Sequence, residues 1–167
     1  MDATIKEAIL QKVRDRLGND LHLVYEEYAY PLLRINQEVL HDTCRFFKEE
    51  LHFSYLNDVF ATDRFTSEDR FEVIYHLISL REQQRFFLKV YVDEENPVLP
   101  TVTDLWNSAN WNEREVYDMF GIRFDGHPDL RRIFLPEDFK YFPLRKEFPL
   151  LGVPGSIELP SSTPDHD

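Results

Sequence analysis

The chain has 167 residues, 43% of them hydrophobic and 14% aromatic, which predicts a folded domain and not a disordered chain. Its 31 acidic residues outnumber its 19 lysines and arginines, so the formal net charge is -12. This balance argues against direct binding to nucleic acid or to an anionic membrane surface, because both depend on clustered cations.

The single cysteine, Cys44, excludes a disulfide framework, a cysteine-based zinc site and a self-contained iron–sulfur cluster. No segment approaches about 18 consecutive apolar residues, so we expect no membrane-spanning helix. The first residues have neither signal-peptide nor transit-peptide character, which predicts a reducing, cytoplasmic setting. A membrane would then be reached only through partner proteins.

The first third of the chain predicts a helix that ends at Gly18, two extended runs over 21–25 and 31–35, and a second helix that begins near Gln37. Apolar residues at spacings of three and four indicate the helices, and these are Ile5, Ile9, Val13 and Leu17 in the first and Leu40, Cys44, Phe47 and Leu51 in the second. Cys44 is therefore expected to be buried and unreactive.

Three strands are predicted next, over 56–61, 71–80 and 86–92, and a last helix over about 102–120. Helix, strands, helix and a meander of strands together predict an α+β domain over 1–121. In this fold class a mainly antiparallel sheet carries helices on one face.

Residues 122–167 form a segment of different character, here called the C-terminal arm. Seven of the ten prolines lie from Pro128 onward, and each fixes a backbone angle and removes a hydrogen-bond donor. We therefore expect an extended, irregular arm without regular structure. Its last part, 156–167, has no apolar pattern and should be disordered when alone.

Motifs for nucleotides, metals and nucleophiles are missing. The sequence contains neither G-x-G-x-x-G nor H-E-x-x-H nor G-x-S-x-G, and Gly121 to Gly126 lacks the Lys-Ser/Thr of a phosphate-binding loop. His127 lies beside Asp125 and Asp129, which could bind a hard cation, but a clamp that hydrogen-bonds loop carbonyls is favoured over a metal site.

Glu113 falls between aromatic residues on one face of the last helix, where an ionised carboxylate must be paired or must change its pKa. Two interpretations stay open. Glu113 could be a general base with a raised pKa. Alternatively, it could accept hydrogen bonds from an arginine of the following loop and fix that loop to the helix.

The arm itself predicts a protein-binding surface. Between residues 131 and 146 there are two acidic residues and five cations. The cations are Arg131, Arg132, Lys140, Arg145 and Lys146. Aromatic residues alternate with these cations, a composition typical of interface cores. We expect Arg145→Glu to weaken assembly by leaving an unpaired charge in the interface.

The run Glu113–Ile122, continued by Phe124, Gly126 to Pro128 and Leu130 to Ile133, closely resembles the signature of the 30 kDa subunit of respiratory complex I. In bacteria this complex is the NADH:quinone oxidoreductase. Pro143 to Pro149 resembles the second block of the same family.

The resemblance implies a non-catalytic subunit of the peripheral arm, on the cytoplasmic side of the bacterial inner membrane. It implies no flavin, cluster or metal in this chain, and it implies packing against the 49 kDa-type subunit, which helps to form the quinone site, and against neighbouring iron–sulfur subunits. The positions that match the family motif are expected to be scaffold and interface residues, namely Glu113, Arg114, Tyr117, Asp118, His127, Arg131, Arg132, Arg145 and Lys146.

Two alternatives remain open beside this interpretation. The first is the equivalent subunit of an ion-pumping membrane hydrogenase or of a ferredoxin-dependent relative, which shares the signature. The second is a free-standing hydrolase that uses Glu113 and His127.

Overall fold

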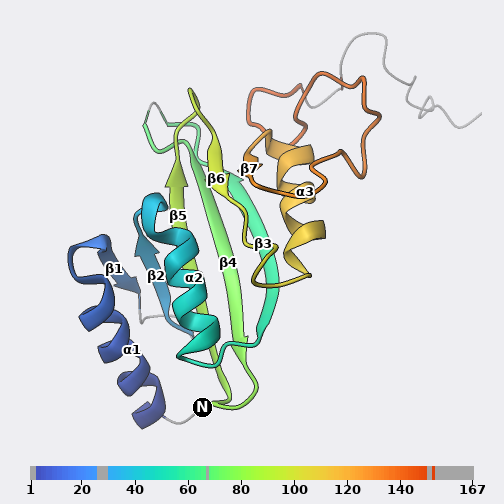
Figure 1. Ribbon diagram of the computed structural model, residues 1–167. Helices are drawn as coiled ribbons and strands as arrows, with labels where there is room; N and C mark the ends of the chain where they lie inside the picture. The colour runs from blue at the N-terminus through green and yellow to red at the C-terminus, as the bar shows by residue number, and fades with distance from the viewer. Residues whose placement is uncertain (1–2, 26–29, 67, 150–151, 153–167) are drawn as a thin grey trace, which may run out of the picture.

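The computed structural model describes residues 3–25, 30–66, 68–149 and 152 (Figure 1). The helices are α1 (Ala3–Leu17), α2 (Leu40–Glu49) and α3 (Ala109–Phe120), with short 3₁₀ turns η1 (Gly18–Asp20) and η2 (Gln37–Val39). The strands are β1 (Leu21–Tyr25), β2 (Leu32–Ile35), β3 (Tyr55–Asp63), β4 (Phe71–Ser79), β5 (Gln84–Val92), β6 (Val98–Pro100) and β7 (Arg123–Asp125). The expectation for 156–167 lies outside the described residues.

Five strands form one sheet in the order β1-β2-β5-β4-β3. Its antiparallel pairs are β1 with β2, β4 with β5 and β3 with β4, which confirms a mainly antiparallel sheet. One pairing departs from that rule, because β2 runs parallel to β5. The chain leaves β2, crosses the sheet through α2 and forms β3 at the far edge, so the returning β5 reaches β2 in the same direction (Figure 1).

The hydrophobic core lies between one face of this sheet and the three helices. Alternate residues of β4, such as Phe71, Val73 and Tyr75, are fully buried, as the two-residue period of a strand requires. They share a single cluster with the apolar stripes of α1 and α2 and with Val116 and Phe120 of α3. This arrangement confirms the α+β class with helices on one face, and Cys44 is buried as expected.

Two boundaries differ from the sequence prediction. The last helix begins at Ala109 rather than near residue 102, because residues 101–108 form turns that are fixed by hydrogen bonds to the Val102 carbonyl. The arm also begins with regular structure, since β7 pairs with β6 in a parallel ladder. Phe124 of β7 and the preceding Ile122 are buried in the core. Within 126–149, the arm has no helix or strand.

No helix in the described part of the chain is long and apolar enough to cross a bilayer.

Candidate functional site: the third helix and the arm that docks on it

The arm turns back over the C-terminal end of α3 at Gly121. This glycine has φ of +76°, a left-handed conformation that ends the helix at low steric cost. A Cβ atom here would lie 2.6 Å from the Phe142 ring and 2.9 Å from Arg145 Nη2. The close approach of the arm therefore requires a residue without a side chain at this position.

Asp118 fixes the start of the returning arm to α3. Its buried carboxylate accepts a hydrogen bond from Arg132 Nη1 at 2.7 Å and bonds from three successive backbone N–H groups, those of Ile133 (3.0 Å), Phe134 (2.7 Å) and Leu135 (3.1 Å). Burial alone would raise the pKa of Asp118, but these hydrogen bonds outweigh it and hold the pKa below its usual value.

Arginines extend this contact in both directions. Arg114 of α3 donates to the carbonyl oxygens of Arg131 (3.0 Å) and Arg132 (3.3 Å) in the arm. Arg132 also donates to the Tyr141 carbonyl oxygen at 3.2 Å, farther along the arm. Both guanidinium groups thus donate to backbone carbonyl oxygens of this chain. These carbonyls belong to a segment that has no helix or sheet hydrogen bonds of its own.

Arg145 packs inside the chain as well. It donates from Nε to the Phe120 carbonyl oxygen at 2.6 Å, which satisfies one of the free carbonyls at the end of α3. Its guanidinium carbon lies 5.0 Å from the Phe71 ring centroid and 4.8 Å from that of Phe142. The prediction for Arg145→Glu assumed an interface cation; in the structure, reversal first affects the packing of the chain itself.

An ionic cluster that the sequence did not suggest joins the arm to the sheet. Arg70 is 4% exposed and donates to both carboxylate oxygens of Asp63, at 3.0 and 2.8 Å, and it also contacts Glu94 and Glu147. The backbone N–H of Lys146 donates to Asp63 Oδ2 at 2.8 Å. Burial raises the pKa of Asp63, but the bonds from Arg70 and from the backbone lower it to about 2.

Of this ionic cluster, only the part in the arm lies in a recognisable sequence motif. Glu147 lies in the second family-like block, whereas Asp63 and Arg70 flank a loop with no motif. Their pairing follows from the β3–β4 hairpin, which brings the two residues together at its end.

The hydrogen-bond partners of Glu113 differ from the arginine that one of its two interpretations named. Its fully buried carboxylate accepts from the Thr101 hydroxyl at 2.6 Å and from the Val102 N–H at 2.8 Å, so it holds the turn before α3. The expected arginine partner in the following loop is therefore wrong. Burial raises the pKa of Glu113 to about 7 against these hydrogen bonds.

His127 acts as the expected loop clamp. Its Nδ1 accepts from the Asp129 N–H at 3.0 Å, which leaves Nε2 to donate to the Asn110 carbonyl oxygen at 3.2 Å. Nε2 also lies 4.0 Å from Glu113 Oε2, and both side chains are closed to solvent. A buried pair with no opening to solvent gives no support to the hydrolase alternative. No group of three metal-binding side chains occurs among the described residues.

The other predicted site residues lie at the surface or at its margin. Arg131 is exposed and pairs with Asp129 at 2.6 Å. Tyr117 is half-buried in α3, and its carbonyl oxygen accepts from the Gly121 N–H at 2.9 Å. Lys146 has an exposed side chain, although its backbone is fixed to Asp63.

Large apolar side chains of α3 and the arm lie in solvent. Four of the exposed large apolar residues belong to α3 and the arm, namely Trp111 (62%), Phe134 (64%), Tyr141 (48%) and Leu144 (53%). Arg132 and Arg145 of the arm are engaged within the chain, whereas Arg131, Lys140 and Lys146 are exposed, so the surface of the arm carries both cations and large apolar groups. Exposed large apolar side chains are typical of sites of protein contact when they lie together in a patch.

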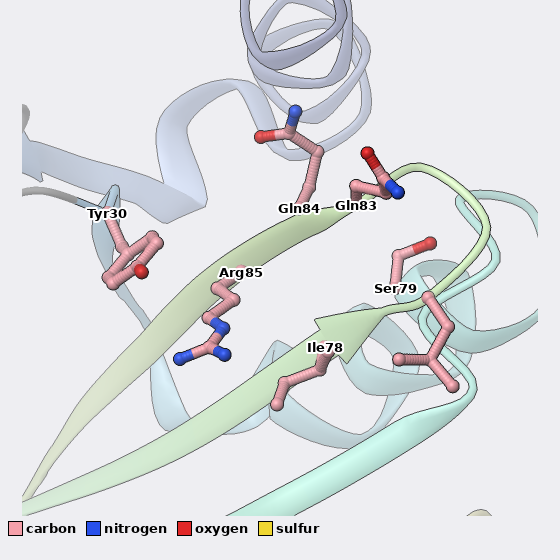
Figure 2. Close-up of a pocket in the computed structure, with 7 residues that line it drawn as sticks. Tyr30, Ile78, Ser79, Gln83, Gln84 and Arg85 are labelled. Atoms are coloured by element: carbon pink, nitrogen blue, oxygen red, sulfur yellow. The ribbon is translucent and has the colours of Figure 1, made fainter. Parts of the chain in front are cut away.

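A hollow of about 420 Å³ lies elsewhere, at the β4–β5 turn (Figure 2). Arg85 and Tyr30 line it side by side, with 5.4 Å between the guanidinium carbon and the ring centroid. Ser79 is the one hydroxyl among its lining residues besides Tyr30, and it donates to the His52 carbonyl oxygen at 2.8 Å. The hollow therefore lacks a nucleophile paired with a base.

Solved structures share this fold. A trypsin-resistant fragment of Nqo5 superposes with a TM-score of 0.66 at 40% identity, over 75% of this chain and 99% of the fragment. A chain of an archaeal respiratory membrane complex, the membrane-bound sulfane sulfur reductase, superposes with a TM-score of 0.74 over 87% of this chain and 86% of that chain. At 24% identity, this second likeness concerns the fold alone.

Sequence relatives agree with that likeness. A subunit of the NADH-quinone oxidoreductase of Rhizobium meliloti is 50% identical over 117 residues, which are 69% of this chain and 64% of that protein. A subunit of the same enzyme from Geobacter sulfurreducens is 40% identical over 84% of this chain and 88% of its own length. The chain thus spans slightly less than two thirds of the first relative and most of the second. Residues 33–154 match the family model of the 30 kDa subunit of respiratory-chain NADH dehydrogenase, and the chain belongs to this family.

Proposed function

We propose that this chain is a non-catalytic subunit of the peripheral arm of a proton-pumping NADH:quinone oxidoreductase. In this role it carries no cofactor or metal and serves as a scaffold for the 49 kDa-type subunit and neighbouring iron–sulfur subunits. It acts on the cytoplasmic side of a bacterial inner membrane and meets the membrane only through the complex. Family membership supports this proposal, as do relatives that are named as subunits of such enzymes.

The observation that carries the scaffold role is the docked arm. Buried ionic contacts at Asp118 and Asp63 fix a segment without helices or strands at two points along its length. The same segment leaves Phe134 and Tyr141 in solvent, where each costs free energy unless another surface covers it. A rigid backbone with exposed aromatic anchors is what a stable protein interface needs.

The experiment is an affinity purification of the tagged chain from its native membranes in mild detergent, followed by an assay of NADH:quinone activity in the eluate. We expect a large complex with flavin and iron–sulfur subunits. Recovery of a hydrogenase or of a ferredoxin-linked complex would instead assign the chain to one of those related enzymes. Recovery of the chain alone would contradict the scaffold role.

A matched pair of variants tests the arm directly. Phe134 and Leu80 are almost equally exposed, at 64% and 66%, but Leu80 lies at the β4–β5 turn. Phe134→Ser should lower recovery of the complex about tenfold, as loss of an interface anchor does. Leu80→Ser should not change it. Equal recovery of both variants would exclude Phe134 as an anchor.

A further inference from the structure

Helix α3 lies beside β3, an edge strand of the sheet (Figure 1). Residues of both elements line a groove. Its volume is about 180 Å³, and its buried or half-buried lining is apolar, with Val59 and Ala61 from β3 and Val116 and Met119 from α3. A cavity of about 150 Å³ is large enough to hold benzene. The groove therefore has room for one large apolar side chain.

The arm completes this groove. Leu144 is one of its lining residues and is held in place because its N–H donates to the Met119 carbonyl oxygen at 3.2 Å. Leu144 is 53% exposed, and Phe60 of β3, which also borders the groove, is 39% exposed. Apolar surface therefore continues from the lining to the rim, as at sites where a second protein inserts a side chain.

Two carboxylates border the same groove from opposite walls, Asp58 on β3 and Glu115 on α3. Both are exposed, and neither forms an ion pair with any residue in the described part of the chain. The nearby arginines do not neutralise them, because Arg132 is bound to Asp118 and Arg145 to the Phe120 carbonyl oxygen. The groove is thus apolar inside and negative at its rim.

We propose that this groove receives one large apolar side chain from another protein of the assembly, on a segment that carries lysine or arginine on either side of it. The apolar side chain fills the space between β3 and α3, and the flanking cations pair with Asp58 and Glu115. Opposite charges across an interface fix its register and exclude wrong partners. This inference rests on the proposed function and names the chemistry of a second contact, distinct from the outer surface of the arm at Phe134.

The first test reverses both rim charges without touching the lining. The double variant Asp58→Lys/Glu115→Lys should fold with little change in its thermal midpoint, since both side chains are exposed and form no ion pair among the described residues. In the affinity purification, we expect about tenfold less complex than with the wild-type chain, because like charges then meet across the interface. The control is Glu49→Lys/Glu50→Lys, an equal charge change at the end of α2, with full recovery expected.

The outcomes separate this inference from the function on which it depends. Full recovery of the double variant beside an assembled wild-type chain would overturn the groove and leave the proposed function intact. Equal losses in the double variant and its control would also overturn the groove, because net charge would then be the cause. A wild-type chain that joins no complex would overturn both.

A second test identifies the occupant without changing a charge. The photo-reactive residue benzoylphenylalanine replaces Phe60 in the assembled complex, and the cross-linked peptide is identified by mass spectrometry. We expect a peptide of another subunit in which an aromatic or aliphatic residue has lysine or arginine beside it. A cross-link to this chain, to a second copy, to lipid or to an acidic segment would overturn the proposal.

Discussion

Arg132 and Asp118 are joined at 2.7 Å across the point where the arm returns to α3, and both side chains are closed to solvent, at 9% and 0% exposure. The Asp118 carboxylate accepts hydrogen bonds from the arginine and from three consecutive backbone N–H groups at the same time. A single helical side chain therefore replaces the hydrogen bonds that a strand or helix would have supplied to this part of the arm.

Replacing this carboxylate should destabilise the chain. Asp118→Asn keeps the size of the side chain but leaves the Arg132 charge buried without a counter-ion. We expect the free energy of unfolding in urea to fall by about 3 kcal/mol, the usual cost of breaking a buried pair. Asp138→Asn, at an exposed position of the arm, is the control and should change it by less than about 0.5 kcal/mol. Equal stability of the two variants would contradict the role of Asp118.

Gly121 can be tested against a second left-handed glycine. At Gly121 an alanine Cβ would meet the Phe142 ring at 2.6 Å, whereas at Gly18, with φ of +51°, it would meet nothing within 4 Å. Gly18→Ala should therefore cost only the backbone strain, about 1 kcal/mol. Gly121→Ala should cost about 2 to 4 kcal/mol because overpacking adds to the strain. Gly121→Ala should also make residues 126–149 more sensitive to protease. Equal losses of unfolding free energy in the two variants would exclude the steric clash.

The stability of the chain should fall with rising pH because of Glu113. Its pKa is raised from 4.5 to about 7 in the folded chain, so stability is full below pH 4.5 and is lost as pH rises to 7. The total loss is about 3 kcal/mol, at 1.4 kcal/mol per unit of pKa. Urea unfolding at pH 5 and pH 7.5 should show this fall in the wild-type chain. Glu113→Gln should remove most of it, and an equal fall in both chains would assign it to another group.

Asp63 should have the opposite dependence at acid pH. Its pKa is lowered from 3.8 to about 2 in the folded chain, so its contribution is present above pH 4 and is lost as pH falls to 2. This loss amounts to about 2 kcal/mol. It should be absent in Asp63→Asn, measured by thermal unfolding across that range. Because Asp63 also binds the Lys146 N–H, the variant should release the second block of the arm at every pH.

Arg145→Glu should act on the isolated chain before any partner is present. The new carboxylate would lie against the Phe120 carbonyl oxygen and two aromatic rings, which offer it no hydrogen-bond donor. We expect the thermal midpoint of the purified chain to fall, with a loss of about 3 kcal/mol for an unpaired buried charge. An unchanged midpoint together with lost assembly would instead return Arg145 to the interface.

Local patterns predicted most elements of this fold. The stripe of Leu40, Cys44 and Phe47 indicated α2, and the alternation in β5 indicated a strand with one buried face. These elements depend on spacing along the chain. The parallel partner of β2 depends on where the chain returns after crossing the sheet, and no spacing encodes that. The β6–β7 ladder was missed because each strand has three residues, too few for a period to show.

The interface role of the motif residues stays a prediction, whereas the structure shows which groups they bind within the chain. Charge patterns showed that arginines gather in the arm, yet composition does not say whether a guanidinium binds its own backbone or another chain. Arg132 and Arg145 bind their own. One of the two interpretations of Glu113 paired it with the loop after the helix, and it binds the turn before the helix instead. A side chain of α3 could reach either the turn before the helix or the loop after it. Only the packing of the folded chain determines which of the two it binds.

The parallel pairing of β2 with β5 also sets an order of events during synthesis. The ribosome releases α1, β1 and β2 before the rest of the sheet, but Leu33 of β2 finds its neighbour Leu88 only after α2 and the β3–β5 meander have emerged. Until then β2 has an open edge and a bare apolar face, the kind of surface that chaperones bind. The nascent segment from α1 to β2 thus needs protection until β5 has been synthesised.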